Sequence, residues 1–384
     1  MKRLLTYMQG DRPIWIVVIL FAILSTVSVY SAAGSLAFRH RGGNAEYYLL
    51  NRFLMVLLGL ACMFVAHRTP YTWFSNISVF GMVVTIPLLV ITLVMGANVN
   101  EAARWLPIPG LSQTFQTSDV AKLFLLLYIA RVLAKRQKVI KDFKQGFLPV
   151  AIPTVLVCAL ILPANFSTSA LLFLTATLLM FVGGISLKHL GKLYGTAIAG
   201  FALLVGISFA APNILPRLET WKNRIENFYE EKPEDTYQVE QAKMSIAQGR
   251  FQGAGPGNNI SKYRLPQSYS DFIYAFMIGE LGIVIGGLSV LLGFLIIMYR
   301  VVRIATKTDK AFATFAALGL GMSLVIQAFI NMCVAVNLIP VTGQPLPFIS
   351  MGGTSTLFSG LQIGIILSIS RSIQSQAEEG PEDE

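Results

Sequence analysis

The chain contains 384 residues, of which 54% are hydrophobic and only 13% are charged, and its formal net charge is +10. A soluble globular domain is typically about half apolar and about a quarter charged, so this composition excludes an ordinary soluble protein. Positive charge on so apolar a chain is typical of membrane insertion and of attraction to anionic headgroups. We therefore expect the membrane as its surroundings and no nucleic acid as a partner.

The apolar residues form blocks of about 17 to 25 residues, each long enough to cross about 30 Å of hydrocarbon as a helix. Repeated blocks of this length predict an all-α integral membrane protein with about ten transmembrane helices. The first block is longer than the apolar region of a signal peptide, so we expect it to remain as the first helix. The predicted spans are residues 14–33, 52–68, 77–96, 119–134, 147–163, 169–185, 193–211, 271–298, 312–337 and 353–370.

Lys and Arg residues determine the predicted orientation, because cytoplasmic loops retain positive charge. With the N-terminus inside, 17 of the 30 basic residues fall in cytoplasmic segments. Only Arg39, Arg41, Arg52 and Arg104 fall in short outer loops. Long translocated loops are exempt from this rule. We therefore expect both termini in the cytoplasm and a large extracytoplasmic loop, residues 212–270, between helices seven and eight.

The rest of the organisation is one membrane domain over residues 1–384, ending in a disordered cytoplasmic tail at 371–384. Within the large loop, residues 217–229 and 235–249 have helical spacing of apolar residues and predict short amphipathic helices. The glycine-rich run 249–258 has no strand before it and no helix directly after it, unlike a phosphate-binding glycine motif. We interpret it as a turn that permits close backbone packing.

The three histidines, His40, His67 and His189, are scattered among loops and span ends. No metal or catalytic cluster can be assembled from residues so placed. We interpret them as exposed interfacial side chains.

Ionisable side chains inside a span cost at least about 2.5 kcal/mol each, so those that are retained are functional candidates. Few occur here: Asp119 and Lys122 at the outer end of span four, Asp271 at the outer mouth of span eight, and Glu280 deeper in that span. Asp119 and Lys122 are three residues apart and share one helical face. Either they form a structural ion pair, or Lys122 contacts a phosphate group.

Asp271 lies where the large polar loop re-enters the membrane. A partly desolvated carboxylate there could take a proton from an attacking sugar hydroxyl. The alternative is a helix N-cap, a position where aspartate is favoured. Glu280 is nine residues further along, half a turn away, so the two carboxylates face opposite sides of a regular helix. That spacing disfavours a paired-carboxylate glycosidase site and indicates a packing or hydrogen-bonding role for Glu280.

The last outer loop, residues 337–355, contains several prolines and glycines that prevent a regular helix. Irregular backbone at membrane depth is tolerated only where protein or a cavity surrounds it. A re-entrant loop lining a site and a stiff connector are both compatible with this composition.

Several separated blocks, in the right order, resemble the shape, elongation, division and sporulation (SEDS) family, and the division members more than the elongation members. The resemblance covers nearly the whole chain. The blocks are VYSAAG at 29–34, NEAARW at 100–105, FQTSDVAK at 115–122, YQVEQAKMSIAQG at 237–249, LPQSYSDFIYAFMIGELG at 265–282 and PVTGQPLPFISMGGTS at 340–355.

The resemblance implies a peptidoglycan glycosyltransferase that polymerises lipid II into glycan strands at the outer face of the bacterial cytoplasmic membrane during cell division. It implies a class B penicillin-binding transpeptidase and other division proteins as partners. It also implies attack by a sugar 4-hydroxyl on the anomeric carbon of the lipid-linked sugar, with Asp271 as the base and polyprenyl diphosphate as the leaving group.

The same resemblance implies a set of substrate-binding residues, among which the basic side chains would offset the charge of the diphosphate. This set is Arg104, Gln116, Ser118, Asp119, Lys122, Lys262, Ser350, Gly352 and Gly353. A divalent cation, Mg²⁺ or Mn²⁺, could share that task, but no cluster of ligands in the sequence identifies a site for one.

Two other classes of function are compatible with the sequence. A transporter or flippase for the lipid-linked precursor should place polar groups along its whole path, whereas the ionisable residues here gather toward the outer half. A non-catalytic scaffold of the division machinery would leave Asp271 dispensable.

Overall fold

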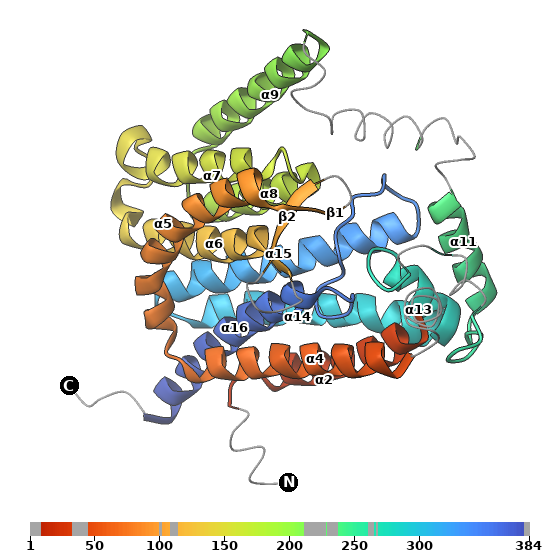
Figure 1. The fold of residues 1–384 in the computed structure, drawn as a ribbon. Coiled ribbons are helices and arrows are strands. Elements are labelled where there is room, and N and C mark those ends of the chain that lie inside the picture. The colour runs from red at the N-terminus through yellow and green to blue at the C-terminus, as the bar shows by residue number, and fades with distance from the viewer. Residues whose placement is uncertain are drawn as a thin grey trace. The chain divides into compact units, whose positions relative to one another are not determined.

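The computed structural model describes residues 9–32, 45–99, 102–107, 114–210, 228, 237–259, 265 and 268–379 (Figure 1). Most of these residues are helical, as expected for apolar segments whose backbone groups must be satisfied internally. The α-helices are α2 (Arg12–Ala32), α4 (Ala45–Arg68), α5 (Tyr71–Met95), α6 (Thr117–Lys135), α7 (Leu148–Ile161), α8 (Phe166–Val182), α9 (Leu187–Ala210), α11 (Tyr237–Gly249), α13 (Ile273–Gly282), α14 (Ser289–Lys307), α15 (Ala311–Ala335) and α16 (Gly353–Glu379). Short π-helical turns, η2 (Phe143–Phe147) and η4 (Ile283–Leu288), precede α7 and α14.

Within the described residues a helix covers each of the ten predicted spans. Seven helical segments are long and apolar enough to cross a membrane. Two predicted spans, those covered by α6 and α9, are not among these seven, and α8 is a shorter apolar helix. The multi-pass membrane architecture is therefore confirmed, whereas the number of ten crossings stays a prediction.

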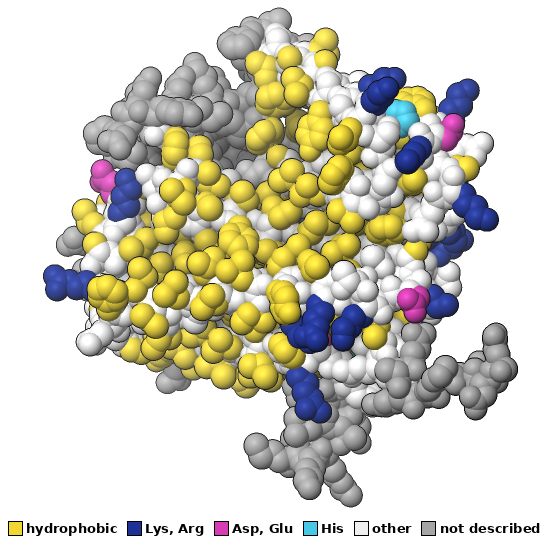
Figure 2. Space-filling model, turned by 180° about the vertical axis from the view of Figure 1, so that it is seen from behind, with side chains coloured by type: hydrophobic (Ala, Val, Ile, Leu, Met, Phe, Trp, Pro, Cys, Tyr) yellow, Lys and Arg dark blue, Asp and Glu magenta, His cyan; other side chains and the backbone are white. Residues whose placement is uncertain are grey.

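The chain forms two compact units. Unit 1 comprises Met1–Pro70, Asn227–Ile304 and Leu324–Glu384, and unit 2 comprises Tyr71–Glu226 and Ala305–Ser323. Figure 2 shows hydrophobic side chains gathered over a broad part of the visible face. Apolar exposure on this scale would be unfavourable in water and is what lipid-facing helices show.

In unit 1, α4 packs directly against α16 through glycines. A Cβ atom on Gly360 would lie 2.3 Å from the carbonyl oxygen of Gly59, and one on Gly364 would lie 2.4 Å from that of Met63. Only small residues allow two helix backbones to approach this closely, as in other membrane helix pairs. The glycines therefore fix α16 on α4.

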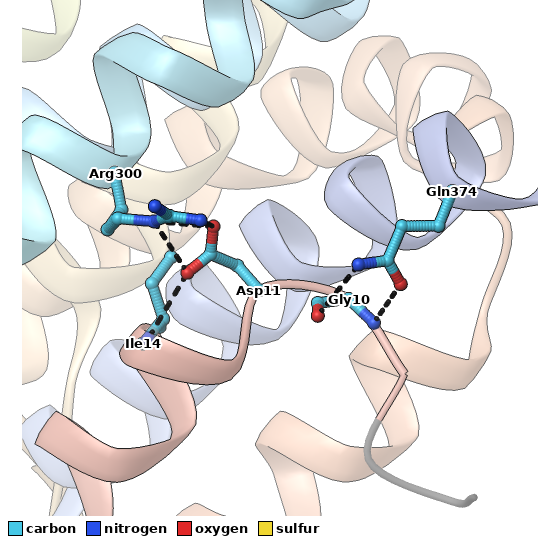
Figure 3. Close-up of polar contacts among 5 residues, drawn as sticks. All are labelled: Gly10, Asp11, Ile14, Arg300 and Gln374. Atoms are coloured by element: carbon cyan, nitrogen blue, oxygen red, sulfur yellow. Dashed lines mark hydrogen bonds and ion pairs between the residues drawn. The ribbon is translucent and has the colours of Figure 1, made fainter. Parts of the chain in front are cut away.

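The segment before α2 is tied to two other helices of unit 1 (Figure 3). Asp11 accepts a hydrogen bond from the N–H of Ile14 at 3.4 Å, as an N-cap does, and forms an ion pair with Arg300 of α14 at 2.6 Å. Gly10 and the side-chain amide of Gln374 exchange two hydrogen bonds, at 2.9 and 3.1 Å. These contacts place the start of α2 beside the ends of α14 and α16.

Gln374 belongs to a stretch for which the sequence prediction was partly wrong. The predicted disordered tail began at residue 371, but α16 continues to Glu379. The sequence 371–379 contains no glycine or proline, so nothing in it stops a helix that is already formed. Residues 380–384 lie outside the described residues.

The interpretation of the histidines as exposed was wrong for His67. Its side chain is fully buried, and its Nε2 atom lies 2.8 Å from the carbonyl oxygen of Gln9. The indole of Trp15 packs edge-on against the imidazole, with ring centroids 5.4 Å apart. The contact partners lie far from His67 in the sequence, which is why a span-end position alone suggested exposure.

The glycine-rich run packs against α13 at backbone distance, as the sequence predicted. A Cβ atom on Gly253 would lie 2.3 Å from the carbonyl oxygen of Glu280, and one on Gly282 would lie 2.3 Å from that of Phe251. Gly282 has a φ of 80°, a conformation that strongly favours glycine. The second predicted amphipathic helix is α11, whereas residues 217–227 and 229 of the first lie outside the described residues.

Unit 2 contains a small sheet that the all-α prediction missed. The strands β1 (Ala97–Val99), β2 (Ala102–Pro107) and β3 (Thr114–Gln116) form an antiparallel sheet in the order β1-β2-β3, with Trp105 opposite Gln116. Backbone groups that leave α5 must find hydrogen-bond partners, and the sheet supplies them. It also places Gln116 directly before α6.

Candidate active site

Asp271 lies in a turn, residues 268–272, immediately before α13. The N-cap of α13 is Phe272, so Asp271 lies one residue before the N-cap position that was considered for it. The carboxylate is half-buried, and its Oδ1 atom accepts a hydrogen bond from the hydroxyl of Ser270 at 2.9 Å. On the other side, a Cβ atom on Gly343 would lie 3.6 Å from Oδ2. The last outer loop therefore passes directly beside this carboxylate.

The second half of that loop, residues 344–350, is packed into protein rather than lying on a surface. Gln344, Leu346, Phe348 and Ile349 are all buried. We call residues 336–352, which connect α15 to α16 without regular structure, the return loop. The burial of residues 344–350 supports the re-entrant alternative over the stiff connector for this half of the loop.

The return loop and the Asp271 turn are held together by a shared set of hydrogen bonds. Asn331 of α15 donates through Nδ2 to the carbonyl oxygens of Asp271 and Gln344, each at 2.8 Å. The hydroxyl of Ser350 donates to the carbonyl oxygen of Ser270 at 2.7 Å and accepts from the N–H of Leu346 at 2.7 Å. The turn that carries Asp271 is therefore held by contacts from both α15 and the return loop.

Arg52 is a part of this arrangement that the sequence reasoning missed. It was assigned to an outer loop, but α4 begins at Ala45 and the Arg52 side chain is only 1% exposed. Its guanidinium donates to the carbonyl oxygens of Phe348 and Ile349, at 2.7 and 3.1 Å. The available signal was the short apolar and aromatic run Tyr47–Leu50, which extends the helix to before this arginine.

Two further contacts complete the surroundings of Arg52. Its Nη1 donates to the hydroxyl of Thr356 at 3.0 Å, and its Nε donates to the hydroxyl of Ser25 at 3.0 Å. Ser25 in turn donates to the carbonyl oxygen of Ile349 at 2.6 Å. Three helices of unit 1, α2, α4 and α16, thus converge on the return loop through one buried cation.

Gly352 and Gly353 stand at the start of α16. The N–H of Gly352 donates to the carbonyl oxygen of Ser350 at 2.8 Å, and the N–H of the neighbouring Met351 donates to that of Tyr269 at 2.8 Å. Gly353 is exposed, and a Cβ atom there would meet nothing within 4 Å. An open helix N-terminus near a carboxylate turn is a setting in which an anionic group of a substrate can be bound.

The other group of predicted residues lies in unit 2. Asp119 and Lys122 form an ion pair on one face of α6, with Nζ 2.8 Å from Oδ1, and both side chains are at least nine-tenths buried. This is the structural pairing that the sequence allowed. Within the described chain the second carboxylate oxygen of Asp119 is buried without a hydrogen-bond partner, so the pair is not fully satisfied by the protein itself.

Gln116 and Ser118 flank the start of α6, and the amide of Gln116 donates to the hydroxyl of Ser118 at 3.0 Å. A cavity of about 20 Å³ beside Ser118, Thr92 and Asn165 has room for a single water molecule. Arg104 lies on β2, and Lys262 lies outside the described residues.

The predicted residues are divided between the two units. In unit 1, Asp271 and Ser350 are linked through Ser270, and Gly352 donates to Ser350. In unit 2, Gln116, Ser118, Asp119 and Lys122 lie at the start of α6. Glu280 is fully buried and accepts a hydrogen bond from the N–H of Gly257 at 2.6 Å, in agreement with its predicted packing role. Among the described residues no group of three or more His, Cys, Asp or Glu side chains is placed to hold a metal ion.

Comparison with known proteins identifies the family. The model of the FtsW, RodA and SpoVE family, described as cell cycle protein, matches residues 11–375. The chain belongs to this family. It is 31% identical over 352 residues to "Probable peptidoglycan glycosyltransferase FtsW" of Nitrosococcus halophilus, covering 90% of this chain and 88% of the relative. It is 30% identical over 366 residues to "Stage V sporulation protein E" of Bacillus subtilis, covering 94% of this chain and 97% of the relative.

Solved structures show the same fold. A chain from a peptidoglycan synthase complex superposes with a TM-score of 0.69 at 21% identity, covering 94% of this chain and 98% of that chain. The rod shape determining protein RodA of Thermus thermophilus superposes with a TM-score of 0.67 at 20% identity, covering 94% of this chain and 97% of that chain. Family membership and the apolar helices together make the chain a multi-pass protein of the bacterial cytoplasmic membrane.

Proposed function

We propose that this family member is a peptidoglycan glycosyltransferase that polymerises lipid II during cell division. The names of its relatives support this activity and favour a division role. The observation that carries the proposal is the placement of Asp271: its half-buried carboxylate accepts from Ser270 and lies beside Gly343 of the return loop, and Asn331 binds its backbone carbonyl oxygen. A carboxylate on a fixed backbone that is still partly accessible suits a general base.

In the proposed reaction the 4-hydroxyl of one sugar attacks the anomeric carbon of a sugar linked to polyprenyl diphosphate. The hydroxyl proton passes to the Asp271 carboxylate as the new carbon–oxygen bond forms. The bond from the anomeric carbon to the diphosphate oxygen breaks, and polyprenyl diphosphate leaves with the bonding electrons. Positioned proton transfer of this kind contributes about 10²- to 10⁴-fold in rate.

The diphosphate needs positive or hydrogen-bonding groups. Lys122, Arg104 and Lys262 are proposed to supply positive charge, and the N-terminus of α16, which begins at Gly353 directly after Gly352, is proposed to supply N–H groups. Gln116, Ser118, Asp119 and Ser350 complete the proposed substrate-binding set, in which the Ser350 hydroxyl also holds the return loop.

The proposed setting is the outer face of the membrane, with ten crossings and both termini in the cytoplasm. A class B penicillin-binding transpeptidase is the proposed partner, because the structural neighbour belongs to a synthase complex of polymerization and crosslinking. Other division proteins are proposed to recruit the pair.

The test uses the full-length protein purified with its transpeptidase partner and supplied with lipid II. The wild type should form glycan polymer, Asp271→Ala should form none, and Glu240→Gln, which neutralises an exposed carboxylate on α11, should match the wild type. Polymer from Asp271→Ala at the wild-type rate would reject the site. Movement of lipid II across liposome membranes without any polymer would instead favour the transporter, and absence of both activities would favour the scaffold.

A further inference from the structure

Unit 2 contains a cavity of about 450 Å³ that the proposed glycosyltransferase reaction does not use. It lies between the first turn of α5, the last turns of α6 and the turn that joins α14 to α15. We call it the α5–α6 pocket. Its volume falls in the range of small-ligand sites, about 300 to 1,000 Å³. All three segments are ones that the Lys and Arg distribution assigns to the cytoplasm.

Positive charge predominates in the pocket lining. Arg131, Lys135 and Lys310 line it, against the carboxylate of Asp309. Lys135 and Lys310 are exposed, and in the described part of the chain neither forms an ion pair within 4.0 Å. Unpaired cations on a concave surface attract anions, because the walls of the cavity concentrate the field.

Arg131 is held in one orientation. Its Nη1 donates to the carbonyl oxygen and the hydroxyl of Ser75, at 2.6 and 2.9 Å, and to the side-chain oxygen of Asn76 at 3.0 Å. Among the described residues the N–H groups on its Nε and Nη2 atoms have no acceptor. A guanidinium fixed on one edge and open on the other is suited to bind phosphate oxygens.

Two helix N-termini also line the pocket. α5 begins at Tyr71 and α15 begins at Ala311, and both first turns are part of the lining. The rings of Tyr71 and Phe312 stack with centroids 6.4 Å apart, which holds the two first turns together. First-turn N–H groups have no partner inside their helix and carry partial positive charge. They add to the charge of the three cations.

An apolar strip leads away from the pocket along α5. Thr72 and Asn76 line the pocket, and at 100° per residue Val79, Phe80 and Val83 lie on the same face of the helix, up to about 10 Å deeper. These three side chains are exposed to 42%, 68% and 63%. Such a strip is suited to contact an acyl chain. Trp73, 53% exposed in the first turn of α5, is a residue type enriched at the membrane interface.

We infer that the α5–α6 pocket binds the headgroup of an anionic phospholipid from the cytoplasmic leaflet. The headgroup phosphate contacts Lys135, Lys310 and the open edge of Arg131, and an acyl chain runs along Val79, Phe80 and Val83. Basic pockets between membrane helices on the cytoplasmic side bind anionic headgroups in this way. A soluble phosphate or an acidic peptide would meet the same cations but would leave the apolar strip of α5 uncovered.

The experiment measures lipid binding to the detergent-purified full-length protein by native mass spectrometry. The probes are phosphatidylglycerol and phosphatidylcholine with identical acyl chains. The wild type should bind phosphatidylglycerol more tightly than phosphatidylcholine. The double variant Lys135→Gln with Lys310→Gln should lower phosphatidylglycerol affinity on the order of tenfold, whereas Asp309→Asn should raise it.

The matched control is Lys138→Gln with Lys141→Gln, which removes two exposed lysines from the same basic segment but outside the pocket. This pair should leave affinity unchanged. The inference would be overturned if both double variants lost phosphatidylglycerol affinity equally. It would also be overturned if the Lys135 and Lys310 double variant kept the wild-type affinity at an unchanged unfolding temperature.

A competition arm distinguishes the source of the phosphate. Inorganic phosphate or a polyglutamate peptide that displaces phosphatidylglycerol at low concentration, in a manner dependent on Lys135 and Lys310, would show an anion or peptide site in place of a lipid site. A variant of the strip, Phe80→Ser, should weaken phosphatidylglycerol binding without changing phosphate binding. Unchanged lipid affinity in this variant would also contradict the inference.

Discussion

Arg52 donates a hydrogen bond of 2.7 Å to the carbonyl oxygen of Phe348, which joins the first third of α4 to the return loop. Phe348 has a φ of 65°, a strained conformation for a residue with a side chain. Strain of this kind persists only where the surroundings impose it. The buried guanidinium of Arg52 therefore holds the return loop in this conformation beside Asp271.

Replacement of Arg52 tests this role. Arg52→Met should lower stability by about 2 to 4 kcal/mol, because several buried acceptors lose a charged donor, and should also reduce glycan synthesis. Arg52→Lys should recover stability in part but not activity, since an ammonium cannot reproduce the fork of the guanidinium. Unfolding temperature and polymer yield, measured on the same preparations, separate the two effects. Full activity of Arg52→Lys would show that the fork is not needed.

Asn331 offers a second test, because it bridges the carbonyl oxygens of Asp271 and Gln344. Asn331→Ala should lower the polymerisation rate about tenfold or more, since small displacements of a catalytic group are costly. The matched variant is Gln327→Ala, one turn earlier on α15, which loses a bond of 2.8 Å to the carbonyl oxygen of Pro345 in the return loop. It should have a smaller effect. Equal rates for the two variants would contradict a positioning role for Asn331.

Variants of the Asp119–Lys122 ion pair on α6 can distinguish a structural role from a role in substrate binding. If Lys122 contacts diphosphate, Lys122→Gln should lower kcat/KM for lipid II about ten- to a hundredfold, the loss expected for one charge-assisted contact. Asp119→Asn should lower stability but retain more polymerising activity than Lys122→Gln. Should the two variants lose stability and activity in equal proportion, the pair is structural only.

The contact between the glycine-rich run and α13 can be tested by stability alone. Gly282→Ala should destabilise by about 1 to 3 kcal/mol, because the backbone has a φ of 80° and the new Cβ would meet Phe251 at 2.3 Å. Gly257→Ala is the matched variant, with a φ of 81° and nothing within 4 Å. Gly257→Ala should lower the free energy of unfolding by only about 1 kcal/mol, the cost of placing a side chain at a positive φ. Thermal unfolding in detergent measures both, and identical losses would mean that the close packing is unimportant.

Helix positions could be predicted from the sequence because each depends on a local run of apolar residues. The glycine-rich turn was predictable for a similar reason, since closely spaced glycines allow another backbone to approach. The sheet at 97–116 was not, because its strands are short and their pairing is set by backbone hydrogen bonds.

Asp271 could be found from its place at the membrane rim, but the groups that hold it could not. Arg52 and Asn331 act on carbonyl oxygens of residues that are distant in sequence, 296 positions away for Phe348 and 60 for Asp271. Nothing in the local pattern around either side chain identifies such a partner. Only the folded arrangement of unit 1 shows which polar residues within helices position the return loop.

The most direct test of the account is a single-turnover measurement on Asp271→Asn, an isosteric change that removes the carboxylate charge. We expect the rate of glycosidic bond formation to fall at least about 10²-fold, while the Kd for lipid II stays within about threefold of the wild type. A retained rate, or a loss of lipid II binding that accounts for the whole loss of rate, would contradict the role of Asp271 as the base.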